Sequence, residues 1–315
     1  MKNKLKLIFF GSSEFALKNL KALLEAGYSI LAVVTQPDKK SGRHLRLTST
    51  PVNIYARQQG LEVLCPCDLL KSEFLEQLAV LKANLFVVAS YGKILPAKLL
   101  SIPGLFALNI HASLLPAYRG AAPIQRAILA GETVTGITII RMNERMDEGD
   151  IINQASITIE PDDNGLSLEQ RLACLANAQI LQTLKLIAAE KVTFTKQDSS
   201  KASLASKLTK ADGLIDWKRD VKTIHNQVRG CFPWPVAFTY LHGKRVKIFT
   251  AQIILKLDSK VAPGQIVKLE GGLIYAATGE GILALKELQA ENGKRISAAE
   301  FISGIRLKAG ESFGI

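Results

Sequence analysis

Two polar side chains near the middle of the chain have the types and spacing to stabilise an anionic reaction intermediate. Asn109 and His111 end an apolar run, residues 106–111, which predicts a β-strand. Side chains two residues apart lie on the same face of a strand, so the amide and the imidazole should point the same way. At the end of a strand, where ligands bind in open α/β sheets, such groups could stabilise an anionic intermediate. The alternative is that Asn109 caps the next loop and His111 is a structural histidine with satisfied partners.

A carboxylate follows the next expected strand, residues 136–141, and could complete this group. We expect Asp147 at the carboxyl edge of that strand, within reach of the same cleft. There it could orient the imidazole or accept a proton. No serine or cysteine nucleophile is required, and the Gly-x-Ser-x-Gly motif of α/β-hydrolases is absent from the sequence. We therefore take Asn109, His111 and Asp147 as candidate catalytic residues.

Residues 1–189 predict the scaffold that positions these side chains. Apolar runs at 7–10, 30–34 and 85–89 are typical of buried parallel strands, and 167–189 predicts a long helix. Alternating strands and helices indicate a Rossmann-like, doubly wound α/β sheet. The first strand-to-helix turn has a single glycine, and the sequence contains neither GxGxxG nor GxxxxGK[ST]. Neither a nicotinamide or flavin dinucleotide nor a P-loop is therefore indicated.

The remainder of the chain predicts a second, smaller domain. Residues 190–208 are mostly Lys, Thr, Ser, Asp and Gln, which is typical of a linker. A helical stretch at 221–229 precedes several short β-like segments separated by glycine turns, which predicts a mainly β, OB-like barrel. We therefore expect a catalytic domain at 1–189, a linker at 190–208 and a C-terminal barrel domain at 209–315.

The charge of the protein is concentrated toward its carboxyl end. The formal net charge is +12. Residues 1–190 hold 20 basic and 17 acidic side chains, a difference of +3, whereas residues 191–315 hold 20 and 11, a difference of +9. The second part could bind a polyanion. The alternative is a basic surface with no specific partner, and charge alone favours neither.

Composition excludes several other classes of protein. The chain has four cysteines, and Cys65-Pro-Cys67 is a CxC pattern without a companion His or Cys cluster. We expect no metal site and no disulfide framework, but free thiols in the reducing cytoplasm. No apolar run approaches the ~20 residues of a membrane helix. No dimer signal stands out, so a monomer is expected.

Several motifs together resemble the folate-dependent formyltransferases, over essentially the whole chain. The most specific is Asn-Ile-His-Ala-Ser-Leu-Leu-Pro-Ala-Tyr-Arg-Gly-Ala-Ala-Pro-Ile-Gln at 109–125. The other matching segments are 10–16, 35–38, 91–96, 215–217 (Ile-Asp-Trp) and 232–235 (Phe-Pro-Trp-Pro), and the last two resemble the branch that acts on methionyl-tRNA. Ser12-Ser13 stands where the family usually has Thr-Pro, and Arg145-Met146-Asp147-Glu148-Gly149-Asp150 where it usually has Gly-Leu-Asp-Thr-Gly-Asp.

The resemblance implies a reaction and roles for particular residues. The formyl group of 10-formyltetrahydrofolate would move to the α-amine of methionine carried by initiator tRNA, with no metal involved. Asn109 and His111 would stabilise the tetrahedral oxyanion, and Asp147 would hold or accept the proton. Ser113, Leu114, Leu115 and Pro116 resemble the folate-contacting loop. For Leu114 and Leu115 the alternative is simple core packing.

A tRNA substrate would also account for the excess basic charge. Residues 36–51 form a long polar connection, and we expect it to be structureless and to fold over the tRNA acceptor end; the alternative is a mobile, solvated loop. Its basic residues are Lys39, Lys40, Arg43 and Arg46. Candidate phosphate contacts in the carboxyl part are Lys207, Lys210, Lys244, Arg245 and Lys247. Trp217, Phe232 and Trp234 could stack on bases, although the prolines flanking Trp234 favour packing or a hinge.

Two rival functions remain open. The same three residues could formylate a small amine, as in purine synthesis or on a sugar nucleotide, but the basic loop and barrel argue against this. A tRNA-binding protein without activity is the other, and the intact Asn109, His111 and Asp147 set argues against it.

Overall fold

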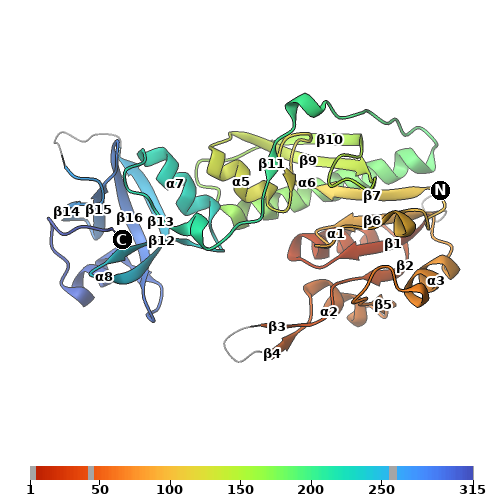
Figure 1. Cartoon of the computed structure of the whole chain (residues 1–315), viewed down its shortest axis with the longest axis horizontal. Coiled ribbons are helices and arrows are strands. Elements are labelled where there is room, and N and C mark those ends of the chain that lie inside the picture. Colours follow the sequence, from red (N-terminus) through yellow and green to blue (C-terminus); the bar gives the residue numbers. More distant parts are fainter. Residues whose placement is uncertain (1–4, 42–45, 255–260, 315) are drawn as a thin grey trace. The chain divides into compact units, whose positions relative to one another are not determined.

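A computed structural model describes residues 5–41, 46–254 and 261–314, with only the backbone of Lys40, Ser41 and Arg46 (Figure 1). The chain forms two compact units. The first comprises Met1–Pro123, Val134–Ile157 and Glu169–Ala205, and the second Ile124–Thr133, Thr158–Leu168 and Ser206–Ile315. The first unit thus takes in most of the expected linker, 190–208. The expected assignment of a catalytic domain to 1–189, a linker to 190–208 and a tRNA-binding domain to 209–315 stays a prediction.

The first unit is built on a seven-stranded sheet of order β10-β9-β7-β6-β1-β2-β5. Its strands are β1 (Lys6–Gly11), β2 (Ser29–Val34), β5 (Val63–Leu64), β6 (Leu85–Ala89), β7 (Phe106–His111), β9 (Val134–Arg141) and β10 (Asp150–Thr158). Neighbours from β5 to β7 run parallel, and β9 runs antiparallel to β7. This confirms the Rossmann-like α/β sheet.

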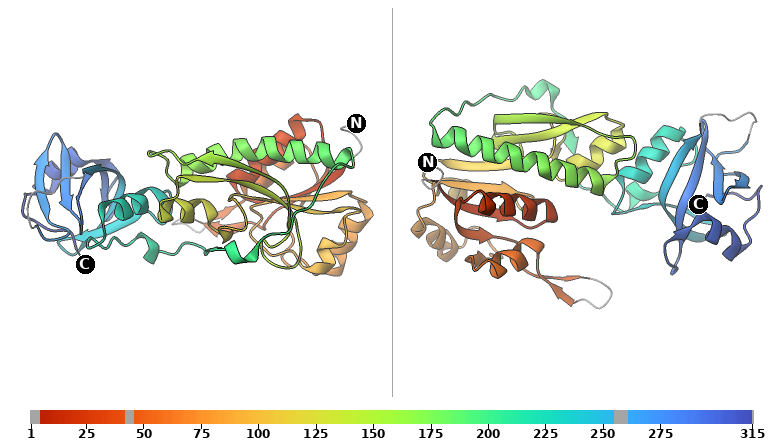
Figure 2. Two further views of the ribbon diagram at one scale, coloured as in Figure 1. Left: turned by 90° about the horizontal axis from the view of Figure 1, so that it is seen from above. Right: turned by 180° about the vertical axis from the view of Figure 1, so that it is seen from behind.

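Helices lie on both faces of this sheet. They are α1 (Glu14–Glu25), α2 (Pro51–Gln58), α3 (Ser72–Val80), α4 (Ala97–Leu100) and α6 (Gly165–Ala188), and α6 is the long green helix of Figure 2. Ile8 and Phe10 of β1 belong to the apolar cluster that includes Phe74 of α3 and Leu99 of α4. Alternation places Leu7 and Phe9 on the other face, and both are fully buried.

The strand register decides where the loops of the sheet meet. Gly11 of β1 lies opposite Ala89 of β6, and Ala89 lies opposite Ile110 of β7. The carboxyl ends of these parallel strands therefore share one edge. Because β9 runs the other way, its last residue, Arg141, lies opposite Leu108 in the middle of β7. β9 therefore ends away from the shared carboxyl edge. The loop that follows β9 must return to that edge to bring Asp147 there.

The polar connection at 36–51 has regular structure. β3 (Lys39–Ser41) and β4 (Arg46–Thr48) form an antiparallel hairpin in which Lys39 lies opposite Thr48. The expectation of a structureless stretch was therefore wrong, because backbone pairing organises both of its arms. Leu47 of β4 is 70% exposed. Arg43 lies outside the described residues.

The second unit contains an antiparallel sheet of order β12-β13-β16-β15-β14, with β17 paired to β16. Its strands are β12 (Ala237–Leu241), β13 (Lys244–Ile254), β14 (Ile266–Glu270), β15 (Leu273–Ala277), β16 (Ile282–Ala290) and β17 (Ile296–Ser297). Near the carboxyl end, Gly314 bridges Tyr240 of β12 and Ser312 bridges Gln265 beside β14. The terminal segment thus joins the two outer strands, which closes the expected small barrel.

The core of this barrel accounts for one candidate aromatic. The helices of the second unit are α5 (Pro123–Ala130), whose first residue belongs to the first unit, α7 (Val221–Gly230) and α8 (Ala298–Ile305). Trp217 is 5% exposed, stacks on Phe313 with ring centroids 5.4 Å apart, and donates its indole N–H to Thr239 Oγ1 at 2.9 Å. Trp217 is therefore a packing residue. Trp234 is 50% exposed. No helix in the described ranges has the length and apolar character needed to span a membrane.

The cysteines offer a test of this packing. The Cys231 thiol, 3.3 Å from the Asp212 carbonyl, is buried, and burial raises its pKa to about 12. Because the thiolate is the reactive form, native Cys231 should resist Ellman's reagent at pH 8, whereas the exposed Cys67 and Cys174 should react. Mass spectrometry of labelled peptides would report each site, and urea-unfolded protein provides the control in which all react. Equal labelling of Cys231 and Cys67 in native protein would contradict this packing.

Candidate active site

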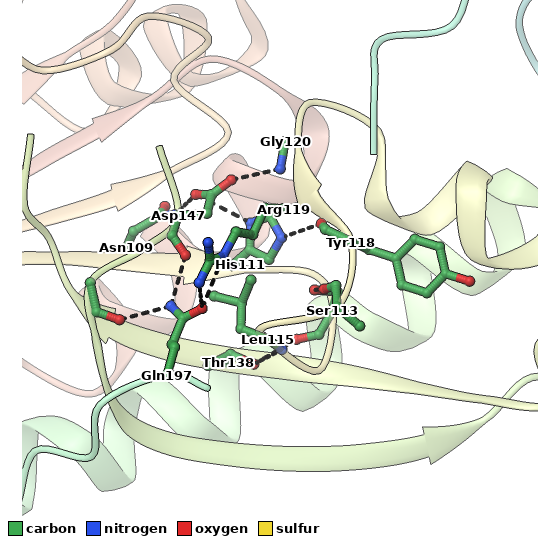
Figure 3. Close-up of polar contacts among 12 residues, drawn as sticks. Asn109, His111, Ser113, Leu115, Tyr118, Arg119, Gly120, Thr138, Asp147 and Gln197 are labelled. Atoms are coloured by element: carbon green, nitrogen blue, oxygen red, sulfur yellow. Dashed lines mark hydrogen bonds and ion pairs between the residues drawn. The ribbon is translucent and has the colours of Figure 1, made fainter. Parts of the chain in front are cut away.

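Asn109, His111 and Asp147 meet in the first unit (Figure 3). Asn109 Nδ2 donates to Asp147 Oδ1 at 3.2 Å, and His111 Nδ1 lies 3.6 Å from the same oxygen. The other carboxylate oxygen, Oδ2, accepts the backbone N–H of Gly120 at 2.8 Å. The expected common face of Asn109 and His111 is thus observed, and Asp147 joins them.

The contacts of His111 decide where its proton lies. His111 Nε2 lies 2.9 Å from the carbonyl oxygen of Tyr118. A carbonyl oxygen can only accept, so Nε2 must carry a hydrogen in this arrangement. Nδ1 therefore faces the carboxylate either as a bare lone pair or, when the ring is charged, as a second donor. A proton that enters the site can be shared between Nδ1 and Asp147 Oδ1.

Asp147 lies in the loop 142–149, whose two ends come very close to each other. A Cβ on Gly149 would lie 1.9 Å from the carbonyl oxygen of Arg141, so only glycine allows the two ends of the loop to approach so closely. Arg141 and Asp150 form an ion pair of 2.6 Å across the same point. Asp147 itself has a φ of 56°, a left-handed conformation that aspartate tolerates better than most residues.

The loop also explains one departure from the family pattern. Glu148, where the family usually has Thr, pairs with Arg119 at 3.2 Å and with Arg145 at 3.5 Å. Arg119 is 6% exposed. A buried guanidinium without a counter-ion would be unfavourable, and Glu148 supplies one. Arg145 and Met146 lie toward solvent, with the Arg145 side chain 80% exposed.

The loop at 113–116 is fixed by polar side chains from β9 and β10. Thr138 Oγ1 donates to the carbonyl of Ser113 at 2.6 Å and accepts the N–H of Leu115 at 3.0 Å. Gln154 Nε2 donates to the carbonyl of Leu115 at 2.9 Å. Leu115 is 3% exposed, as the core-packing alternative requires, whereas Leu114 is only partly buried. Thr138 and Gln154 were not expected from the sequence, where a polar residue in a strand carries no such signal.

The candidate tRNA contacts are spread over both units. Lys39 is exposed, with its Nζ 2.5 Å from Gln36 Oε1. In the second unit Lys207, Lys210, Lys244 and Arg245 are exposed and Lys247 is half-buried. These positions suit phosphate contacts, but nothing in the described residues brings them into one site, and their roles stay predictions.

The sequence of the whole chain matches one enzyme family. The family described as "Formyl transferase" matches residues 4–184, and "Formyl transferase, C-terminal domain" matches residues 207–306. The chain belongs to the formyl transferase family. It is 41% identical over 309 residues to the methionyl-tRNA formyltransferase of Nitrosomonas eutropha, with 98% of each chain covered. It is 42% identical over 310 residues to that of Geobacter metallireducens, covering 98% of this chain and 99% of that one.

Solved structures of more distant proteins share the formyl transferase fold. An N-formyltransferase from Helicobacter canadensis, in complex with folinic acid and dTDP-3-aminofucose, matches with a TM-score of 0.68 at 18% identity, over 93% of this chain and 100% of that one. HypX from Aquifex aeolicus, in complex with tetrahydrofolic acid, matches with a TM-score of 0.67 at 16% identity, over 98% of this chain and 48% of that one. Among the described residues of this chain, no group of three or more His, Cys, Asp or Glu could hold a metal ion.

Gly120 provides a test of the site's backbone. Its φ is 124°, and a Cβ there would lie 2.7 Å from the carbonyl oxygen of Ala205. Gly120→Ala should therefore displace the N–H that holds Asp147. Gly27→Ala is the matched control, because Gly27 has a φ of 77° and open space around its Cα. The control should lose about 1 kcal/mol of unfolding free energy, and Gly120→Ala roughly 1–3 kcal/mol more. Equal urea-unfolding midpoints for the two variants would contradict the close approach.

Proposed function

We propose that this protein transfers the formyl group of 10-formyltetrahydrofolate to the α-amino group of methionyl-initiator tRNA. The observation that carries this proposal is the 41–42% identity, over 98% of the chain, to proteins named for that activity. The meeting of Asn109 and His111 at Asp147 supplies the chemistry, because acyl transfer needs oxyanion donors and a proton acceptor in one place.

The chemistry of the transfer follows from the groups present. The neutral amine attacks the formyl carbon, a C–N bond forms and the formyl oxygen becomes an oxyanion. The amide of Asn109 has two N–H groups, and only one of them donates to Asp147. The second can donate to the oxyanion. Both ring nitrogens of His111 already face Tyr118 and Asp147, so the ring contributes through the positive charge that it carries when it holds the shared proton. Collapse of the intermediate breaks the bond from the formyl carbon to N10 of the folate, and N10 leaves with a proton.

The proton that the amine loses needs a place in the site. Asp147 Oδ1 and His111 Nδ1 face each other at 3.6 Å, so an incoming proton can be shared between them and then passed to the leaving nitrogen. The side chains of His111 and Asp147 are 6% and 12% exposed. This burial limits competition from water for the proton and strengthens the electrostatic contacts.

We assign the two substrates to different parts of the molecule, the folate to the loop at 113–116 and the tRNA to basic side chains. In this proposal the partly exposed Leu114 and Pro116 contact the folate, and Ser113 and the buried Leu115 hold the loop in shape. The exposed Lys39 of the hairpin and the exposed Lys244 and Arg245 of the barrel contact tRNA phosphates in this proposal. Four free cysteines fit a reducing compartment, so we place the activity in the cytoplasm. We also propose a monomer, because the sequence carries no strong dimer signal.

Single substitutions of the three central residues test the assignment. Asn109→Ala, His111→Ala and Asp147→Asn should each lower kcat by ~10²–10³, the usual effect of removing one oxyanion donor or proton acceptor. The measurement is transfer of radiolabelled formyl from 10-formyltetrahydrofolate to charged initiator tRNA. Asn84→Ala is the control, because this amide accepts the Lys6 N–H at 2.8 Å outside the site. Wild-type protein that formylates a sugar amine faster than methionyl-tRNA would refute the proposed substrate.

Salt dependence tests the phosphate contacts of the barrel. If Lys244 and Arg245 each neutralise one phosphate, Lys244→Ala and Arg245→Ala should each lower the slope of log Kd against log salt concentration by about 1. Lys71→Ala, which removes an exposed lysine paired with Glu73 in the first unit, is the control and should leave the slope unchanged. An unchanged slope in both barrel variants would remove these two residues from the tRNA contacts.

A further inference from the structure

The segment after α6 is anchored to the first unit at successive points. The ring of Phe194 packs edge-on against Phe106, with centroids 5.6 Å apart. The guanidinium carbon of Arg141 lies over the Phe194 ring, 4.3 Å from its centroid. Next, Thr195 and Ile151 exchange two backbone hydrogen bonds of 2.8 Å each. These contacts make the segment a fixed part of the first unit, and they fix the backbone just before Gln197.

The side chain of Gln197 connects two parts of the active site (Figure 3). Its Nε2 donates to the carbonyl of Asp147 at 2.7 Å and to that of Gly149 at 2.8 Å. Its Oε1 accepts from Nε and Nη2 of Arg119 at 3.1 and 2.8 Å. Both N–H groups and the carbonyl of the amide are thus used.

These contacts act on the conformation of Asp147. The two carbonyls that Gln197 binds flank Glu148, and the Glu148 carboxylate is held by Arg119 at 3.2 Å. Asp147 has a φ of 56°, and such a conformation persists when neighbouring contacts determine it. Gln197 and Arg119 therefore fix the direction in which the Asp147 carboxylate leaves the backbone.

The same segment also fixes the backbone opposite Asp147. β11 (Leu204–Ala205) pairs in parallel with β8 (Arg119–Gly120). Ser203 accepts the N–H of Arg119 on its carbonyl at 2.8 Å and the N–H of Tyr118 on its hydroxyl at 2.9 Å. Tyr118 supplies the carbonyl that holds His111, and Gly120 the N–H that holds Asp147.

We propose that Gln197 is a positioning residue of the transfer reaction. It keeps the Asp147 loop and Arg119 in the relative placement that lets one carboxylate meet Asn109, His111 and the Gly120 N–H. Its own contacts are with Arg119 and two loop carbonyls, so it acts through Asp147. This inference rests on the proposed function for its kinetic consequences, whereas its structural consequence can be measured without any activity.

Two substitutions separate the contacts of Gln197. Gln197→Met keeps the length of the side chain and removes all its hydrogen bonds. Gln197→Glu keeps the acceptor for Arg119 and removes the two N–H donors, since an ionised carboxylate has none. Each should lower kcat by about 10–100-fold and change KM for the folate by no more than about threefold. Ser199→Ala, at an exposed position of the same segment, is the control. A kcat within twofold of wild type in both Gln197 variants would overturn the proposal.

A double-mutant cycle distinguishes positioning from general stability. If Gln197 acts through Asp147, Gln197→Met should lower the residual kcat of Asp147→Asn by less than about twofold. A residue that merely supports the fold would lower kcat by the same factor in both backgrounds. An equal factor would therefore overturn the proposal. Gln197→Glu in the same cycle gives the answer if Gln197→Met does not fold.

Amide hydrogen exchange tests the placement independently of the reaction. The Gly120 N–H is bound to Asp147 Oδ2 at 2.8 Å, so its exchange, followed by NMR, should quicken at least about tenfold in Gln197→Glu and stay unchanged in Ser199→Ala. Unchanged exchange in Gln197→Glu would overturn the positioning role even if the wild type is fully active. Wild-type protein without formyl transfer would instead refute the proposed function, and the exchange result would still decide the role of Gln197.

Discussion

The Asp147 carboxylate is the group on which the organisation of the site depends. One oxygen accepts the Asn109 amide and faces the His111 ring, and the other accepts the Gly120 N–H. All of this takes place where little water can replace a lost partner, because the Asp147 side chain is only 12% exposed. A shift of the carboxylate would therefore leave the partly buried donors of Asn109 and Gly120 without their partner at once, at about 1–3 kcal/mol for each group that water does not reach.

This dependence follows from the direction of one strand. Parallel strands would deliver their next residues to a common edge, as β1, β6 and β7 do. Because β9 is antiparallel, its end lies beside the middle of β7, and an eight-residue loop without helix or strand, 142–149, must return toward His111. The left-handed conformation of Asp147 in this loop is held by contacts with Gly120 and Gln197, which lie outside it. The close approach of Gly149 to the Arg141 carbonyl and the ion pair of Glu148 with Arg119 further restrict the loop.

Much of the scaffold could be predicted because it depends on patterns that a sequence displays. Apolar runs located β6, β7 and β15 at their observed bounds, and glycine-separated segments indicated a small barrel. Its closure by the segment at 312–314 was not predicted. The spacing of Asn109 and His111 placed both on one face. The position of Asp147 came from the assumption that its strand ended at the common edge. Asp147 instead reaches the site through the loop 142–149, because β9 is antiparallel to β7. The direction of a strand depends on its pairing partners, which hydrophobic periodicity does not reveal.

The segment after α6 shows why the remaining part of the site could not be predicted. Its composition is typical of a linker because most of its side chains face solvent and its fixed placement comes from backbone pairing at Thr195 and at β11. Backbone hydrogen bonds leave no trace in composition, since nearly every residue type can make them. Three side chains add to this pairing: Phe194 packs against Phe106, the Ser203 hydroxyl accepts the Tyr118 N–H, and Gln197 has every polar atom engaged. In sequence, however, Gln197 is one glutamine among polar neighbours. Residues that hold a site together from outside it are identified by their contacts, and contacts of this kind join parts of the chain 48–78 positions apart.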